Sequence, residues 1–191
     1  MASTPPVAGA AGSTMSAQSR VVTSGSGRRW LAVLRLATGF IFLWAFLDKT
    51  FGLHYSTGAP VEGGTPSVAW IDGGTPSQGF MKFAAVGPFK DFFASIAGTF
   101  TDWLFMAALL GIGIGLMAGV ALRITAVAGT ILMLCMWAAE WPPLEGSSNP
   151  IVDYHIIYAL VMIVCAVLYA GDTWGLGRWW GSLVGRQHWL R

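Results

Sequence analysis

Residues 103–141 read WLFMAALLGIGIGLMAGVALRITAVAGTILMLCMWAAEW, and Arg123 is the only charged residue in this run before Glu140. A bilayer core of roughly 30 Å needs about 20 apolar residues per helical span. The run is therefore long enough for two spans. We predict a tight hairpin of two membrane-spanning helices, residues 103–122 and 124–141, with Arg123 in the turn.

Two further apolar tracts flank the hairpin, at residues 30–51 and 151–170. The chain of 191 residues has a mean hydropathy of +0.61 and only 10% charged residues, whereas soluble domains carry about 25%. The sequence therefore predicts an all-α membrane protein, a four-transmembrane-helix bundle over residues 30–180 that contacts the lipid bilayer.

The two ends of the chain differ from this bundle in composition. Residues 1–29 are rich in Ala, Ser, Gly, Thr and Pro, so we predict a disordered tail there; residues 181–191 form a second tail. Arginines gather before the first tract, in the hairpin turn and after the fourth tract. By the positive-inside rule, both termini face the cytoplasm of a multi-pass protein of the cell membrane. The net charge of +2 reflects this orientation and indicates no nucleic-acid partner.

The first loop, residues 52–101, repeats the pattern Gly-Gly-Thr-Pro-Ser at 63–67 and 73–77, which is turn chemistry. Beyond the repeat, Phe89, Phe92, Phe93 and Ile96 share one helical face. This pattern is typical of a short amphipathic helix on a membrane surface. We expect a partly helical extracytoplasmic loop that covers the outer mouth of the bundle.

The fourth tract has a marked start. Asn149 can cap the helix, Pro150 suits its first position, and Asp153 favours the helix dipole. The second helix carries glycines at four-residue spacing, which allow another helix to approach closely, within the chain or in a homo-oligomer. These glycines are Gly111, Gly115 and Gly119.

The two cysteines, Cys135 and Cys165, lie at depths that differ by about 12 Å at the rise of an α-helix. A disulfide needs Cα atoms within about 7 Å. We therefore predict two free cysteines that behave as small apolar residues. No motif for a metal or a covalently bound cofactor is present in the sequence, so neither is predicted.

Ionisable residues gather where the outer ends of the predicted helices meet, and charged groups at membrane depth suggest function. Lys49 and protonated His155 could bind an anion, and Glu140 or His155 could transfer protons, so these three are the candidate catalytic residues. The candidate substrate-binding residues are neighbouring polar groups and two loop glycines whose backbone amides could help hold an anion: Asp48, Asp153, Tyr154, Gly73 and Gly74. The alternative is structural, with Asp48 marking the membrane interface and Asp153 the helix start.

Two other polar features have structural interpretations. Arg35, inside the first helix, either snorkels to the cytoplasmic headgroups or pairs with Asp172. A stripe on the fourth helix is more typical of a packed core than of a ligand groove; it comprises Tyr154, Tyr158, Val161 and Cys165.

Four segments of the chain resemble the DoxX/DoxD membrane family. They read DGGTPSQGF at 72–80, EWPP at 140–143, NPIVDYH at 149–155 and GDTWGLGR at 171–178. The first and third are similar to the DoxD branch, the large subunit of thiosulfate:quinone oxidoreductase. The resemblance covers residues 28–180, with four helices in the same order.

This resemblance implies oxidation of thiosulfate to tetrathionate at the outer face, with electrons passing to a membrane quinone. The quinone would lie in an apolar slot lined by Trp44, Trp137 and Tyr158. The family enzyme also has a smaller, DoxA-like subunit, which would be a separate partner here. Two alternatives stay open: a non-catalytic membrane anchor for soluble redox or sulfur-handling enzymes, and a transporter, although the helices lack the breaks typical of transporters.

Overall fold

The computed structural model describes residues 15–190 except 62–63, 145–146, 148 and 186. Its long helices are α2 (Gly25–Phe51), α4 (Thr99–Ala118), α5 (Leu122–Glu140) and α6 (Tyr154–Val167). The short α-helices are α1 (Ala17–Val21), α3 (Lys90–Ile96) and α7 (Gly177–Val184). Single helical turns are η1 (Trp70–Asp72), η2 (Phe80–Ala84), η3 (Gly87–Phe89), η4 (Ala170–Asp172) and η5 (His188–Leu190).

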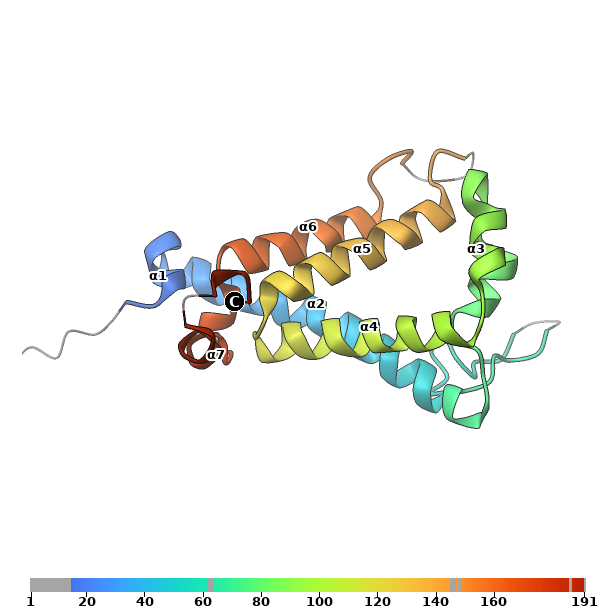
Figure 1. Ribbon diagram of the computed structural model, residues 1–191, viewed down its shortest axis with the longest axis horizontal. Coiled ribbons are helices and arrows are strands. Elements are labelled where there is room, and N and C mark those ends of the chain that lie inside the picture. Colours follow the sequence, from blue (N-terminus) through green and yellow to red (C-terminus); the bar gives the residue numbers. More distant parts are fainter. Residues whose placement is uncertain (1–14, 62–63, 145–146, 148, 186, 191) are drawn as a thin grey trace, which may run out of the picture.

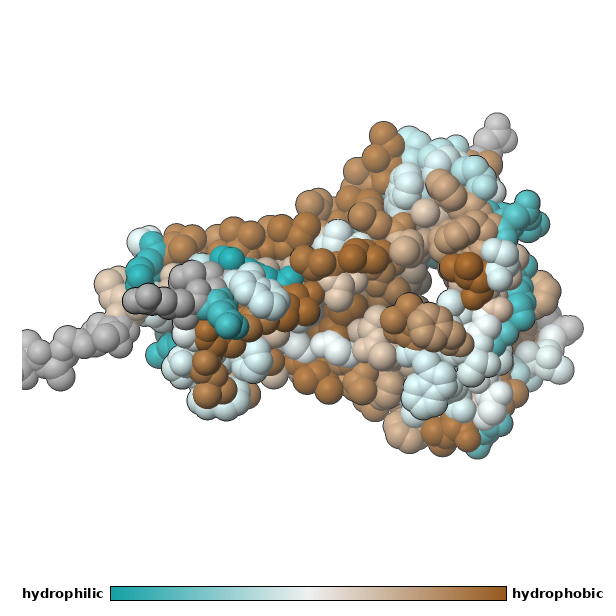
Figure 2. Space-filling model, in the orientation of Figure 1, coloured by the Kyte–Doolittle hydropathy of each residue, from teal (hydrophilic) through white to brown (hydrophobic). Residues whose placement is uncertain are grey.

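The predicted all-helical class is confirmed for this described part of the chain, which contains no strand. Three helices, α2, α4 and α5, are long and apolar enough to cross a membrane. Figure 2 shows the corresponding apolar surface along the middle of the molecule, with hydrophilic residues concentrated toward its two ends. The helix α6 is also apolar, but its 14 residues are fewer than the span predicted at 151–170.

The long helices form two pairs, α2 with α4 and α5 with α6 (Figure 1). The pairs meet where a short turn joins α4 to α5, and they diverge toward the opposite end, where α3 crosses between them. We call these the joined end and the open end. The helices α1 and α7 lie at the joined end. The hairpin is as predicted, but its turn falls at Gly119–Ala121, where Gly119 and Ala121 have φ of +71° and +49°; Arg123 lies in the first turn of α5.

Two of the three predicted packing glycines serve contacts within the chain. A Cβ at Gly115 would collide with the Thr125 hydroxyl of α5, and one at Gly119 would lie 2.7 Å from the Cα of Gly171. A Cβ at Gly111 would meet nothing within 4 Å. Close helix approach is therefore confirmed at Gly115 and Gly119, while association of two chains through these glycines stays a prediction.

The prediction of a disordered tail over residues 1–29 is wrong from Ala17 onward, and residues 1–14 lie outside the described part. The hydroxyls of Ser16 and Ser24 cap α1 and α2 by accepting the N–H groups of Ser19 and Gly27. Gln18 is buried, and its backbone N–H donates to Oδ2 of Asp172 at 3.1 Å. At the other end, α7 and η5 extend helical structure into the predicted tail at 181–191.

The start of the fourth helix is also corrected. The side-chain oxygen of Asn149 accepts the N–H groups of Ile151 and Val152, which makes a turn before the helix. Asp153 is the residue that caps α6, by accepting the N–H groups of His155 and Ile156. The helix begins at Tyr154, directly after this cap.

Candidate functional site

The open-end cluster consists of Glu140, Asp153, Tyr154 and His155, where α5 ends and α6 begins. The Tyr154 hydroxyl donates to Oε1 of Glu140 at 3.0 Å, which links the two helices. Asp153 caps α6, so His155 follows in the first helical turn and is fully buried. The structure thus brings together four residues that the sequence analysis named as site candidates.

Within this cluster, His155 Nδ1 lies 2.8 Å from Oδ2 of Asp153. An ionised carboxylate only accepts hydrogen bonds, so Nδ1 is the donor in this pair; in the neutral imidazole, Nε2 is then the acceptor. Nε2 is buried and has no hydrogen-bond partner among the described residues. A carboxylate that orients an imidazole in this way gives a base of fixed tautomer, suited to proton transfer.

The cluster also has the donor set of a divalent-metal site. One ligand atom each from Glu140, Asp153 and His155 lie within 4.8 Å of one another. Carboxylate oxygen and imidazole nitrogen are ligands that zinc accepts. The sequence spacing did not reveal this set, because Glu140 and the other two residues come from different helices.

The Asp48 carboxylate fastens the loop that follows α2. It accepts the backbone N–H groups of Tyr55, Ser56 and Thr57 and the Ser56 hydroxyl, at 2.6–3.1 Å. Asp48 is 1% exposed. These bonds favour the structural interpretation of Asp48 over substrate binding.

The backbone amides of Gly73 and Gly74, which were expected to help hold an anion, already donate hydrogen bonds within the chain. The N–H of Gly73 donates to the carbonyl of Trp70, and that of Gly74 to the carbonyl of Ala69. Both bonds close the turn after η1, where Gly73 has φ of +90°. The glycines are therefore needed for the turn, as their residue type indicates.

Lys49 lies at a different place from the open-end cluster, beside an apolar cavity of about 500 Å³ between α4 and α5. Neither Glu140 nor His155 lines this cavity. Its other lining residues are mostly apolar and come from α4, α5 and the loop between α2 and α4, among them Leu104, Phe105, Ile131, Leu132, Met136, Phe80 and Phe93. Lys49 is the only charged lining residue, and its ammonium forms no ion pair or hydrogen bond within the described chain.

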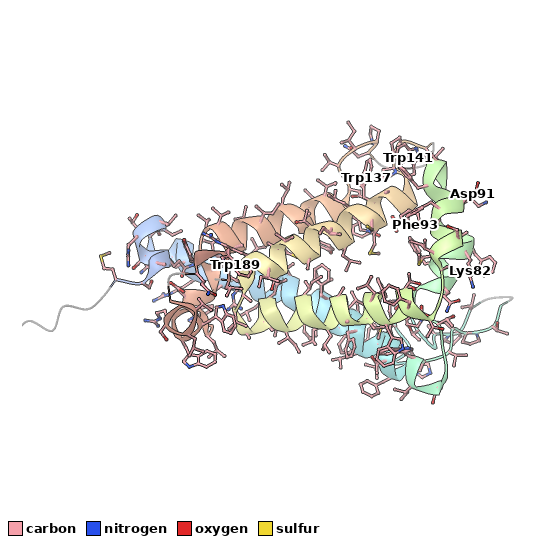
Figure 3. All side chains as sticks on the ribbon, viewed as in Figure 1. Lys82, Asp91, Phe93, Trp137, Trp141 and Trp189 are labelled. Carbon is pink, nitrogen blue, oxygen red and sulfur yellow. The ribbon has the colours of Figure 1, made fainter. Side chains whose placement is uncertain are left out.

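The open end of the cavity is covered by the capping loop, residues 77–96. Figure 3 shows Phe93 of α3 directed toward the bundle, while Asp91 points away from it; Phe93 is buried with Met81, Ala85 and Ala139. The N–H of Val86 donates to the carbonyl of Ala139 at 2.8 Å. The predicted short helix in the loop is confirmed as α3. Two residues of its predicted aromatic face, Phe89 just before the helix and Phe92 within it, are exposed.

The acid that holds this loop, Asp102, was not a candidate in the sequence analysis. It is 3% exposed and accepts hydrogen bonds from Ser77 and from the Gln78 side chain. Two sequence features could have indicated its role: an acid in the first turn of an apolar helix, and a Thr-Pro-Ser turn whose residues offer hydrogen-bond donors. No local pattern pairs the two residues, because 25 positions separate Ser77 from Asp102.

The three aromatic residues expected around a quinone each have different packing partners. Trp44 stacks edge-on against Tyr55 at 5.1 Å between ring centroids. Trp137 donates to the carbonyl of Ile151 at 2.9 Å, and Figure 3 shows it beside Trp141 at the end of α5. Tyr158 packs against Phe42 in the core. None of the three lines the cavity at Lys49.

At the joined end, Arg35 is fully buried. Its guanidinium donates to five main-chain carbonyls, those of Leu116, Met117, Ala170, Thr173 and Trp174. These carbonyls belong to the C-terminal end of α4 and to the chain around η4, where a cation is favoured. Arg35 therefore binds helix ends inside the bundle, and snorkelling to the surface is wrong.

Cys135 and Cys165 are both free thiols. Cys135 is exposed and lines the cavity beside Lys49, whereas Cys165 is fully buried in the helix core. The two thiols therefore differ in accessibility, and Cys135 is a native reporter of the cavity.

Fold and site together define an all-helical protein with three candidate membrane-spanning helices and an apolar cavity that opens between two of them. Beyond this class, comparison adds nothing: no family model, curated protein or solved structure matches the chain.

Proposed function

We propose that the chain is the membrane subunit of a thiosulfate:quinone oxidoreductase-like system and belongs to the DoxX/DoxD family. The observation that carries the proposal is the apolar cavity with Lys49 as its single charged group. A quinone has an apolar ring and carbonyl oxygens that accept hydrogen bonds. In this cavity the Lys49 ammonium donates to one carbonyl, and Phe105 and Met136 contact the ring.

The proposed topology has four spans in the cytoplasmic membrane, with the joined end inside. The helix α6 and the turns through η4 form the fourth span, because 14 helical residues alone cover only about 21 Å. The inside assignment is supported by Arg28 and Arg178, which lie in the first turns of α2 and α7 at the joined end. The open end, with the capping loop, then faces the outer side.

The proposed reaction balances between two substrates. Two thiosulfate ions join through a new sulfur–sulfur bond to give tetrathionate and release two electrons; the quinone takes up two electrons and two protons to give the quinol. Glu140 and His155, near the open end, transfer protons. The membrane quinone is the electron acceptor, and the proposal needs no bound cofactor in this chain.

The same geometry favours a partner for the sulfur chemistry. The open-end cluster carries two carboxylates, the amides of Gly73 and Gly74 are occupied, and Lys49 lines a separate cavity. A dianion therefore needs cationic groups that this cluster does not supply. We assign them to a small DoxA-like subunit or to a soluble redox enzyme. If that enzyme performs the whole reaction, the chain is its membrane anchor, and this is the second candidate function.

The test is thiosulfate-dependent reduction of decylubiquinone by the purified chain in nanodiscs, alone and with the soluble proteins encoded beside it. The proposal predicts quinol and tetrathionate in equal amounts when the partner is present. Quinol formation that persists when the chain is replaced by empty nanodiscs assigns catalysis to the soluble enzyme. Absence of quinol under both conditions contradicts the oxidoreductase proposal.

A further inference from the structure

The seam between α4 and α5 holds a second cavity beside the one at Lys49. This second cavity, of about 540 Å³, lies further along this seam and shares Ala108 and Ala128 with the first. Small residues of both helices line it, including Ala107 and Gly111 of α4 and Ala128 of α5. The two cavities are therefore adjacent along the seam, and we call the pair, which extends from Lys49 toward the joined end, the groove.

This groove is open along its side. Leu104 of α4 and Ile131 of α5 both line the first cavity and are each 59% exposed. They belong to the two helices that form a candidate membrane-spanning hairpin, so the opening faces lipid if the hairpin spans the bilayer. Figure 2 shows a hollow on this side of the molecule near the open end. The open end itself is covered by the capping loop.

The groove is polar at the end near Lys49 and apolar along the rest of its length. Lys49, Ser77 and Thr101 line the first cavity near the start of α4, while the second cavity is lined almost entirely by apolar residues. A molecule that fits must have a polar head that accepts a hydrogen bond from an ammonium and a long apolar chain. The alanines and Gly111 leave room for such a chain between the helices.

We propose that this groove binds the isoprenoid chain of the quinone, which reaches Lys49 from the bilayer between α4 and α5. The inference rests on the proposed function for the identity of the head group. It adds that the length of the isoprenoid chain determines the affinity for the quinone, and that the isoprenoid chain contacts the protein at Ala128 and Gly111.

The native Cys135 allows a direct binding test. N-ethylmaleimide labels Cys135 in folded chain in nanodiscs, while fully buried Cys165 stays unlabelled; a Cys135→Ala variant verifies the assignment. Protection is measured with decylubiquinone, which has a long chain, and duroquinone, which has none. Both rings are fully substituted, so neither adds to a thiol. Oleate serves as the lipid-chain probe.

The groove is altered by Ala128→Phe, which fills it, with Val127→Phe as the neighbouring control that is 62% exposed and lines neither cavity. Gly111→Leu is a second filling variant, since a Cβ there meets nothing within 4 Å. We expect decylubiquinone to protect Cys135 at concentrations at least tenfold below duroquinone. Both filling variants should raise the half-protecting concentration of decylubiquinone at least tenfold and leave that of duroquinone unchanged, and Val127→Phe should change neither.

Equal protection by the two quinones, or decylubiquinone protection unchanged in both filling variants, overturns the inference. Oleate protecting as strongly as decylubiquinone, with the same loss in the variants, also overturns it, because the occupant is then a lipid chain. Turnover is read separately. If protection depends on the length of the quinone's side chain but no thiosulfate-dependent turnover occurs, the groove assignment holds and the proposed function is contradicted. If turnover occurs but protection does not depend on that length, the proposed function holds and the groove assignment is contradicted.

Discussion

Ser77 donates both its backbone N–H and its hydroxyl to Oδ1 of Asp102, at 2.8 and 2.7 Å. Oδ2 of the same carboxylate accepts the Gln78 side chain at 2.7 Å. The start of the capping loop is thereby fixed to the first turn of α4, next to the cavity. Both Ser77 and Asp102 are buried, so these hydrogen bonds have no water to replace them.

Replacing Asp102 with Ala should destabilise this attachment. The buried N–H of Ser77 is left without an acceptor, which costs about 2–3 kcal/mol. We expect a lower melting temperature, measured in a Cys135→Ala background with a thiol-reactive dye, so that the dye reports only exposure of the buried Cys165. Asp91→Ala, at an exposed position on α3, is the control. A melting temperature equal to that of the control means that Asp102 does not hold the loop.

The middle of the capping loop depends on a glycine at the start of η3. Gly87 has φ of +73°, and a Cβ there would collide with the Trp141 ring of the neighbouring turn. Gly87→Ala should therefore lower stability by roughly 1–3 kcal/mol and raise the rate of Cys135 labelling, because the loop separates from α5. Gly79→Ala is a matched control, since its Cβ meets nothing within 4 Å and its φ is −58°. Similar labelling rates in the two variants contradict this account of the loop.

Arg35 should tolerate no replacement, including the conservative one. Lysine has three donors and no planar fork, so it cannot satisfy the five carbonyls that Arg35 binds. We expect Arg35→Lys to lose most folded protein, measured by monodisperse yield in mild detergent, while Arg29→Lys at an exposed position keeps it. Normal yield of Arg35→Lys shows that the carbonyls find other donors.

The features that were predictable from the sequence are those with a local cause. The apolar run broken by Arg123 predicted the α4–α5 hairpin, because span length and one charge suffice to define it. Glycine spacing predicted close packing at Gly115 and Gly119. The helix at Lys90–Ile96 followed from its aromatic periodicity.

The features that were missed depend on competition or on distant residues. Asn149 and Asp153 both suit a helix cap, and only the structure shows that Asn149 closes a turn while Asp153 caps α6. Gly73 and Gly74 could offer amides to a ligand or to a turn, and the turn uses them. The cavity at Lys49 arises because the two helix pairs diverge, a relationship between helices that no single segment encodes.

Two substitutions in the open-end cluster test whether Glu140 transfers protons or only links α5 to α6 through Tyr154. Tyr154→Phe removes the hydroxyl that binds Glu140 but keeps the aromatic ring, so it should lower stability by about 1 kcal/mol. Glu140→Gln keeps a hydrogen-bond acceptor but cannot transfer a proton. If Glu140 transfers protons, Glu140→Gln should reduce quinone turnover at least tenfold and Tyr154→Phe much less, measured as quinol formed per folded chain. Equal, small losses in both variants indicate a structural role.

The most direct test of the central claim is the KM for decylubiquinone in thiosulfate-dependent reduction, compared between the unaltered chain and Lys49→Met in nanodiscs with the partner present. Loss of one hydrogen bond from a charged donor costs about 1.5 kcal/mol, which corresponds to roughly a tenfold change. The account predicts a KM about tenfold higher in Lys49→Met and an unchanged KM in Lys90→Met, whose side chain is exposed on α3. An unchanged KM in Lys49→Met would contradict the claim that the quinone binds beside Lys49 between α4 and α5.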